Sequence, residues 1–155
     1  MLLHVTENLE LVAAGADVWR LLRDTERFAR LVASVQSVEP MESPDKEAYR
    51  VQVMEKVGPF KVIMKLDVAV TEMVELETLG ATVKGVDAAG RSRATGTLRV
   101  ELTPSTAGTL MRFVVNVEVL GKLAALGAPV IRRRVTELFN DFGQRVVAEF
   151  AVAKA

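Results

Sequence analysis

Cysteine is absent from this chain of 155 residues, and histidine, tryptophan and tyrosine occur once each. Without cysteine the chain can form no disulfide framework, no thiolate metal site and no cysteine nucleophile. A single histidine, His4, excludes a multi-histidine zinc site and most schemes that use a serine triad. We therefore expect no bound metal and no cofactor.

A net charge is also lacking, because 20 basic side chains balance 20 acidic ones. A neutral chain does not have the basic footprint that is typical of nucleic-acid binding. No apolar run reaches the roughly 18 residues of a membrane span, and the N-terminus has neither the basic nor the apolar segment of a secretion signal. We expect a cytoplasmic protein without a nucleic-acid partner.

What the chain has in quantity is apolar side chains. Half of its residues are hydrophobic and 26% are charged, a composition that is typical of a globular protein and not of a disordered or collagenous one. No linker rich in Gly, Pro or Ser and no internal repeat divides the chain. Length and composition together predict a single domain over residues 1–155.

Alternation of apolar and polar residues predicts most of the secondary structure. The alternation loses its phase near Thr78 and Leu79, so a β-bulge is expected there. Strands with this pattern form an antiparallel sheet that has one buried face and one wet face. The expected strands cover residues 3–12, 35–38 (leading into Pro40), 48–57, 60–71, 73–86 and 91–103, and a last strand that follows a turn over 104–108.

The helices are expected near the two ends of the chain. Two short helices follow the first strand, one capped by Gly15 and one by Asp24. From Lys122 to the end the apolar period changes from about 2 to about 3.6, which predicts one long amphipathic helix. A glycine and a proline near its start predict a kink or a restart at 128–130. This order predicts an α+β fold in which a curved antiparallel sheet is closed by the long helix.

Four short segments in register carry a resemblance that extends over essentially the whole chain. They read VWRLLRD (18–24), KVGPF (56–60), ATG (94–96) and GKLAALG (121–127). They resemble the CoxG family of carbon monoxide dehydrogenase proteins, which is part of the START/polyketide-cyclase-like (SRPBCC) superfamily. One departure is the segment 31–34, where the family usually has a proline-glycine turn.

The resemblance implies a helix-grip fold, in which a seven-stranded antiparallel sheet wraps around a long C-terminal helix. It implies an apolar cavity between sheet and helix, open at one end, that holds a lipophilic small molecule of quinone-like or lipid-like chemistry. It further implies a molybdenum hydroxylase of the carbon monoxide dehydrogenase type as partner, and transient contact with the inner face of the membrane. Relatives with this fold include cyclases and hydrolases, so an enzyme is the alternative to a carrier.

The residues that we expect to line the cavity lie on the inward faces of the strands and the long helix. Among them Ala94 and Gly96 are small, which either admits the helix at close range or leaves a void for a ligand. A core that is completely filled would instead favour an assembly partner that holds no ligand. The expected lining residues are Val53, Glu55, Phe60, Met64, Leu66, Ala94, Gly96, Leu98, Met111, Phe113, Val115, Leu126, Val130, Arg134 and Leu138.

Glu55 falls on an inward face between Val53 and Val57, where a lone carboxylate is costly to bury. One interpretation is that the strand frays or bulges near the turn at Gly58, so that Glu55 reaches water. The other is a carboxyl group with a raised pKa that hydrogen-bonds a ligand, or that serves an enzyme as acid or base. Glu7 raises the same question on the first strand. Because no nucleophile accompanies these glutamates, we predict binding and not catalysis.

The other polar candidates are His4 and the run Arg132 to Arg134. His4 belongs to the wet face of the first strand, where a surface role is expected. Three consecutive residues spread around a helix, so at least one arginine should lean toward the apolar side while its charge stays solvated. The alternative function for this run is contact with acidic lipid headgroups or an acidic partner at the cavity opening.

Overall fold

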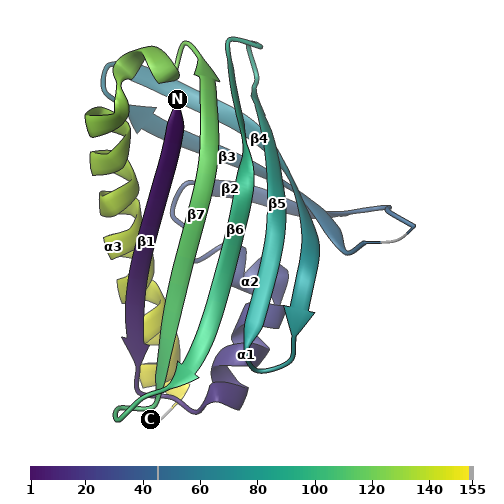
Figure 1. Ribbon diagram of the computed structural model, residues 1–155, viewed down its shortest axis with the longest axis vertical. Coiled ribbons are helices and arrows are strands. Elements are labelled where there is room, and N and C mark those ends of the chain that lie inside the picture. Colours follow the sequence, from purple (N-terminus) through teal and green to yellow (C-terminus); the bar gives the residue numbers. More distant parts are fainter. Residues whose placement is uncertain (45, 154–155) are drawn as a thin grey trace.

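The computed structural model describes residues 1–44 and 46–153. Its seven strands form one sheet in the order β1-β7-β6-β5-β4-β3-β2, with every neighbouring pair antiparallel. The predicted α+β helix-grip fold is confirmed (Figure 1). The elements are β1 (Leu2–Leu11), α1 (Gly15–Arg23), α2 (Thr25–Ala29), β2 (Val35–Met41), β3 (Ala48–Val57), β4 (Phe60–Val74), β5 (Thr78–Asp87), β6 (Ser92–Pro104), β7 (Thr109–Gly121), the 3-10 turn η1 (Ala124–Leu126) and α3 (Ala128–Ala153).

Alternation along each strand separates an inner face, toward α3, from an outer face. In β6, Leu98 and Val100 stand opposite Val115 and Phe113 of β7 on the inner face, whereas Arg99 lies outside and is exposed. This is the pattern expected when one side of an antiparallel sheet is buried and the other is wet.

The core lies at the end of the sheet where α1 packs. Val100 and Met111 from the sheet are essentially fully buried there together with Val18 of α1. Phe142 of α3 is in edge-to-face contact with Phe113, with ring centroids 5.6 Å apart, an arrangement that aromatic pairs favour. These contacts join α1, α3 and the inner face into one hydrophobic cluster.

The long helix begins later than the apolar period predicted. After β7 the chain forms η1, and Gly127 with φ of +87° then redirects it into α3 at Ala128. Pro129 therefore occupies the first turn, where its missing N–H has no helical partner to lose. The predicted restart at 128–130 is confirmed, and residues 122–127 do not belong to the helix.

Two local predictions were wrong. The lost phase near Thr78 and Leu79 marks a chain reversal and not a bulge, because β4 continues to Val74 and a turn over 75–77 precedes β5; the register shift lies between Val70 and Glu72. Gly15 is the first residue of α1, and Ala14, whose side chain cannot accept a hydrogen bond, takes the N-cap position.

Helix α3 crosses the concave side of the sheet near two of its strands. Its backbone comes close to β1 and to β3, near the two edges of the sheet, and much less to the strands between them; in Figure 1 α3 runs beside β1. At Gly143 the approach is tight, because an added Cβ would lie 3.3 Å from Leu9 Cδ1 of β1. The sheet thus curves around α3, and its middle strands are left facing the helix at longer range.

Candidate ligand-binding surface

The inner face of the sheet has a packed part and a partly exposed part. Val100 and Met111 have lost nearly all of their accessible surface, whereas inward residues farther along the same strands keep some of it. We call this partly exposed part the inner surface. It comprises Val53, Leu66, Val68, Val83, Ala94, Gly96, Leu98, Val115 and Val117 of the sheet, with Arg134, Val135 and Leu138 of α3.

Seven of the residues predicted to line a cavity belong to the inner surface with partial exposure, besides the pair Glu55 and Arg134: Val53, Leu66, Ala94, Gly96, Leu98, Val115 and Leu138. Phe60 and Leu126 line a small hollow of about 120 Å³ at one end of the sheet. The cavity between the sheet and α3 stays a prediction.

The remaining predicted lining residues lie elsewhere. Met64, Met111 and Phe113 are buried, and the last two are covered by the α1–α3 cluster. Val130 is 40% exposed, because Ile131 takes the buried position in the first turn of α3. These four residues have little or no free inward surface in this conformation.

Gly96 is small for a reason that the sequence did not indicate. A Cβ at this position would lie 1.9 Å from the carbonyl oxygen of Asn116 and 2.7 Å from the Cα of Val117, both in β7. The close approach is therefore between two strand backbones, and neither the helix nor a void requires the glycine. Gly85, which the sequence reasoning missed, has a different role, because the side chains of Leu66 and Met64 lean over it.

Glu55 is partly buried and paired with an arginine of α3. Strand β3 remains regularly paired through Val57, so the fraying that would carry Glu55 into water does not occur. Arg134 donates from Nε to Glu55 Oε1 at 2.8 Å and also through Nη2, and the Glu55 side chain is only 17% exposed. The hydrogen bond to Glu55, with one to Glu137, raises the pKa of Arg134 above its ordinary value. The pair joins β3 to α3 at the edge of the inner surface.

The other polar candidates lie as the sequence predicted. Arg134 is the arginine that leans inward, while Arg133 is exposed and Arg132 donates to the His4 carbonyl oxygen at 2.8 Å. His4 is exposed and hydrogen-bonded to Asn116 on the outer face. Glu7 keeps its inward place opposite Phe113 in the register and is partly exposed.

A second polar cluster, missed from the sequence, lies at the opposite end of β3. Arg23 of α1 forms an ion pair with Glu47 at 2.9 Å, and the Tyr49 hydroxyl donates to the same carboxylate. Burial, with this hydrogen bond next, raises the pKa of Tyr49 above its usual value. No local pattern could reveal the cluster, because Arg23 and Glu47 are 24 residues apart.

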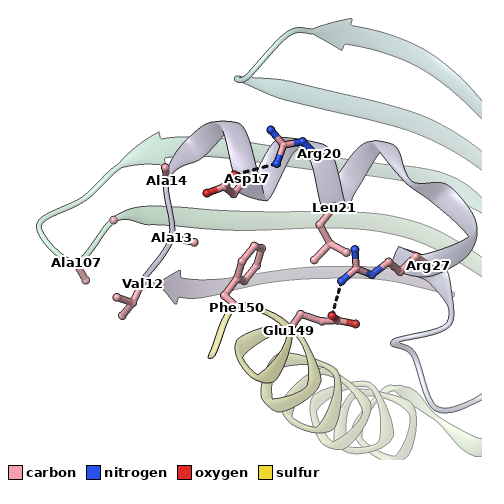
Figure 2. Close-up of a pocket in the computed structure, with 11 residues that line it drawn as sticks. Val12, Ala13, Ala14, Asp17, Arg20, Leu21, Arg27, Ala107, Glu149 and Phe150 are labelled. Atoms are coloured by element: carbon pink, nitrogen blue, oxygen red, sulfur yellow. Dashed lines mark hydrogen bonds and ion pairs between the residues drawn. The ribbon is translucent and has the colours of Figure 1, made fainter. Parts of the chain in front are cut away.

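The larger hollow, of about 560 Å³, lies at the end of the molecule where β1, α1 and the end of α3 meet (Figure 2). Leu21 and Phe150 contribute apolar surface to it. Its charged side chains are paired with one another, Arg27 with Glu149 at 2.6 Å and Arg20 with Asp17 at 3.0 Å. No residue predicted to bind a ligand lies in this hollow.

Two negative findings concern the described residues, 1–44 and 46–153. No helix within them is long and apolar enough to cross a membrane. That part of the chain also contains no group of three or more His, Asp or Glu side chains arranged to hold a metal ion.

The fold and the apolar inner surface define a START-like helix-grip protein. Solved structures with this fold include a conserved protein from Geobacillus kaustophilus (TM-score 0.85, 22% identity, 97% of each chain covered). Others are a START superfamily protein from Mycobacterium smegmatis (0.71, 13%, 94% of this chain and 95% of that one) and the Zhui aromatase/cyclase from Streptomyces sp. R1128 (0.62, 14%, 94% of each). At these identities the likeness shows the fold alone.

The family follows from the sequence match. The model of CoxG, a family of carbon monoxide dehydrogenase proteins, matches residues 9–150, and the chain belongs to this family. No curated protein matches the chain.

Proposed function

We propose that this protein binds one lipophilic small molecule, quinone-like or lipid-like, against the inner surface between the sheet and α3, and that it carries this molecule without transforming it. The observation that supports the proposal is the partial exposure of inward apolar residues such as Leu66, Leu98 and Val115. Apolar side chains that face inward yet remain accessible are what a pocket for a lipophilic ligand provides, since its binding removes them from water.

Carriage is favoured over catalysis by the chemistry available at this surface. Glu55, the residue on which an acid–base mechanism would depend, is engaged by Arg134 of α3. The single histidine lies on the outer face. An aromatase/cyclase shares the fold at 14% identity, so an enzyme remains the alternative, with Glu55 as its acid or base.

Membership of the CoxG family supports the finer part of the proposal. The partner would be a molybdenum hydroxylase of the carbon monoxide dehydrogenase type, and the carried molecule would be exchanged between that enzyme and the membrane. The protein would then be cytoplasmic and transiently peripheral to the inner face of the membrane.

The proposal is tested by filling the inner surface from one strand position and comparing the neighbouring position. Ala94 faces inward and Thr95 faces outward and is exposed. Ala94→Phe should weaken binding of a soluble short-chain quinone at least about tenfold, because it occupies apolar volume that the ligand needs. Thr95→Phe should bind like the wild type. Binding is measured by calorimetry, and native mass spectrometry of protein from its own host identifies any retained molecule.

Thermal unfolding of each variant checks that it is folded, and the pair Val115→Trp (inner) and Val114→Trp (outer) repeats the comparison on β7. Wild-type protein that carries no molecule from its host and also ignores added quinones would contradict the proposal, as would equal binding by the inner and outer variants. Turnover of a ligand that stops in Glu55→Gln while binding persists would establish the enzyme alternative.

A further inference from the structure

The positive charges of this neutral protein gather at one end. This end, the upper one in Figure 1, comprises the β3–β4 turn, the β5–β6 turn and the connection from β7 into α3. Six cationic side chains on these segments are exposed, and we call them the basic rim: Lys56, Lys61, Arg91, Lys122, Arg132 and Arg133.

The basic rim is not neutralised by carboxylates. None of the ion pairs within the part of the chain that the structure describes involves a member of the rim. At the opposite end, by contrast, arginines are paired, for example Arg20 with Asp17 and Arg112 with Glu101. Asp87 lies among the rim residues, but its Oδ1 accepts a hydrogen bond from the Ala89 amide.

One feature of the rim is unfavourable for folding. Lys56 and Lys61 stand directly opposite one another in the β3–β4 register. Like charges at such a position destabilise a sheet. An arrangement that opposes stability points to a role in binding an anionic partner.

Apolar groups lie within the rim. Pro59 is exposed at the tip of the β3–β4 turn, and Phe60 and Leu126 line the hollow of about 120 Å³ together with Lys61, Arg91 and Lys122. The Lys122 ammonium lies 4.7 Å from the centre of the Phe60 ring. Val130, in the first turn of α3, is 40% exposed.

We propose that the basic rim docks on a membrane surface that contains anionic lipid. Cations around an apolar centre match the two layers that such a surface offers, phosphate headgroups outside and hydrocarbon beneath. An acidic protein would satisfy the cations but not the exposed apolar tip. The inference rests on the proposed function, because a lipophilic ligand must leave a bilayer to be carried, and docking here sets the 120 Å³ hollow against that bilayer.

Vesicle flotation of the full chain tests the docking. The wild type should bind phosphatidylcholine vesicles that contain phosphatidylglycerol and should not bind pure phosphatidylcholine. Lys56→Glu/Lys61→Glu should weaken binding about 30-fold or more, since each basic residue near an anionic surface contributes about 1 kcal/mol. Raising the salt to about 1 M, where the Debye length falls to ~3 Å, should release the protein.

The matched control is Arg20→Glu/Arg145→Glu, which changes the net charge equally at exposed positions of other segments. It should bind vesicles nearly as the wild type does. Equal losses in both variants would reduce the effect to net charge and overturn the proposal. Absence of vesicle binding at low salt would also overturn it, and binding to polyglutamate alone would replace the membrane by an acidic protein.

Docking and carriage can fail separately in this design. The rim variant should keep its affinity for a soluble short-chain quinone while it loses the vesicles. A wild type that binds anionic vesicles but no quinone would contradict the proposed function and leave the docking surface intact.

Discussion

Gly96 lies where β6 and β7 approach so closely that no side chain fits between them. The clash of an added Cβ would be with backbone atoms of Asn116 and Val117. At Gly85, on the neighbouring strand, the clash would be with the ends of two side chains, Leu66 at 2.5 Å and Met64 at 3.2 Å. A methyl group can be accommodated when side chains rotate, but a paired strand cannot move without loss of hydrogen bonds.

We predict that Gly96→Ala and Gly85→Ala differ strongly in stability. Gly96→Ala should lower the free energy of unfolding by about 3 kcal/mol or more, because β7 must shift, and Gly85→Ala by about 1 kcal/mol. Urea denaturation monitored by circular dichroism measures both values. Equal losses would show that the backbone approach is not what demands a glycine at position 96.

Tyr49 is the single tyrosine of the chain, so its ionisation can be followed without interference. Its hydroxyl is partly buried and donates to Glu47, which Arg23 also holds. Burial first, and the bond to Glu47 second, raise its pKa in the folded protein. The folded state therefore holds the phenol proton to a higher pH than the unfolded chain does.

The expected consequence is a loss of stability at alkaline pH. The contribution of Tyr49 is fully present below the unfolded pKa of about 10 and is lost as the pH rises through the higher folded value. Near-ultraviolet absorbance should place the titration of native protein above that of protein in urea. Glu47→Gln should move the native midpoint down toward the ordinary value, whereas Glu42→Gln, at an exposed position, should leave it unchanged. A native midpoint at or below that of the unfolded chain would refute this account.

Between elements, the position of α3 against β3 depends on a charged contact. On the β1 side the helix packs closely at Gly143 against Leu9. On the β3 side Arg134 reaches from α3 to Glu55 and bonds its carboxylate through Nε and Nη2. A charge next to an apolar surface is tolerated there because it is paired and hydrogen-bonded.

Removing this contact should cost more than removing a neighbouring charge. Arg134→Met should lower the free energy of unfolding by about 1–2 kcal/mol, less than for a fully buried pair because the Arg134 side chain is 33% exposed. Arg133→Met, at an exposed position of the same turn, should change it by less than about 0.5 kcal/mol. Urea denaturation again provides the measurement. If both variants unfold at the same urea concentration, Arg134 does not hold α3 to β3.

In the whole molecule, packing and accessibility divide the inner face. Val18, Met111 and Val146 are fully buried in one cluster that ties α1, the sheet and α3 together. Farther along the strands, where α3 stays near β1 and β3 only, the inward side chains remain accessible. One part provides most of the stability through burial, and this leaves the other free to bind a ligand.

Charge is divided as well, although its sum is zero. The basic rim lies at the end that carries the 120 Å³ hollow, and the arginines elsewhere are paired with carboxylates. A neutral sequence excludes a strong overall field, but it does not exclude a local one, because steering and surface binding depend on where the charges lie.

Most of the fold was predictable because it depends on periodicity within short segments. The β3 boundaries at 48 and 57 and the restart of the helix at 128 are examples. The β4–β5 turn was misinterpreted, since Met73, Val74 and Leu76 are apolar and yet exposed around a reversal. Leu76 even adopts a φ of +66°, a conformation for which glycine or asparagine is the usual indication.

The sequence by itself determined the seven strands, the closing helix, the family and the inward direction of Glu55, because each follows from alternation or from a motif along the chain. Only the tertiary structure decided that Arg134 pairs with Glu55, that Gly96 makes room for β7, that Arg23 joins Glu47 and Tyr49, and that the six cations of the basic rim share one end. The physical reason is that these are contacts between segments distant in sequence. Their partners are set by the curvature of the sheet and the path of α3, and no local pattern encodes either.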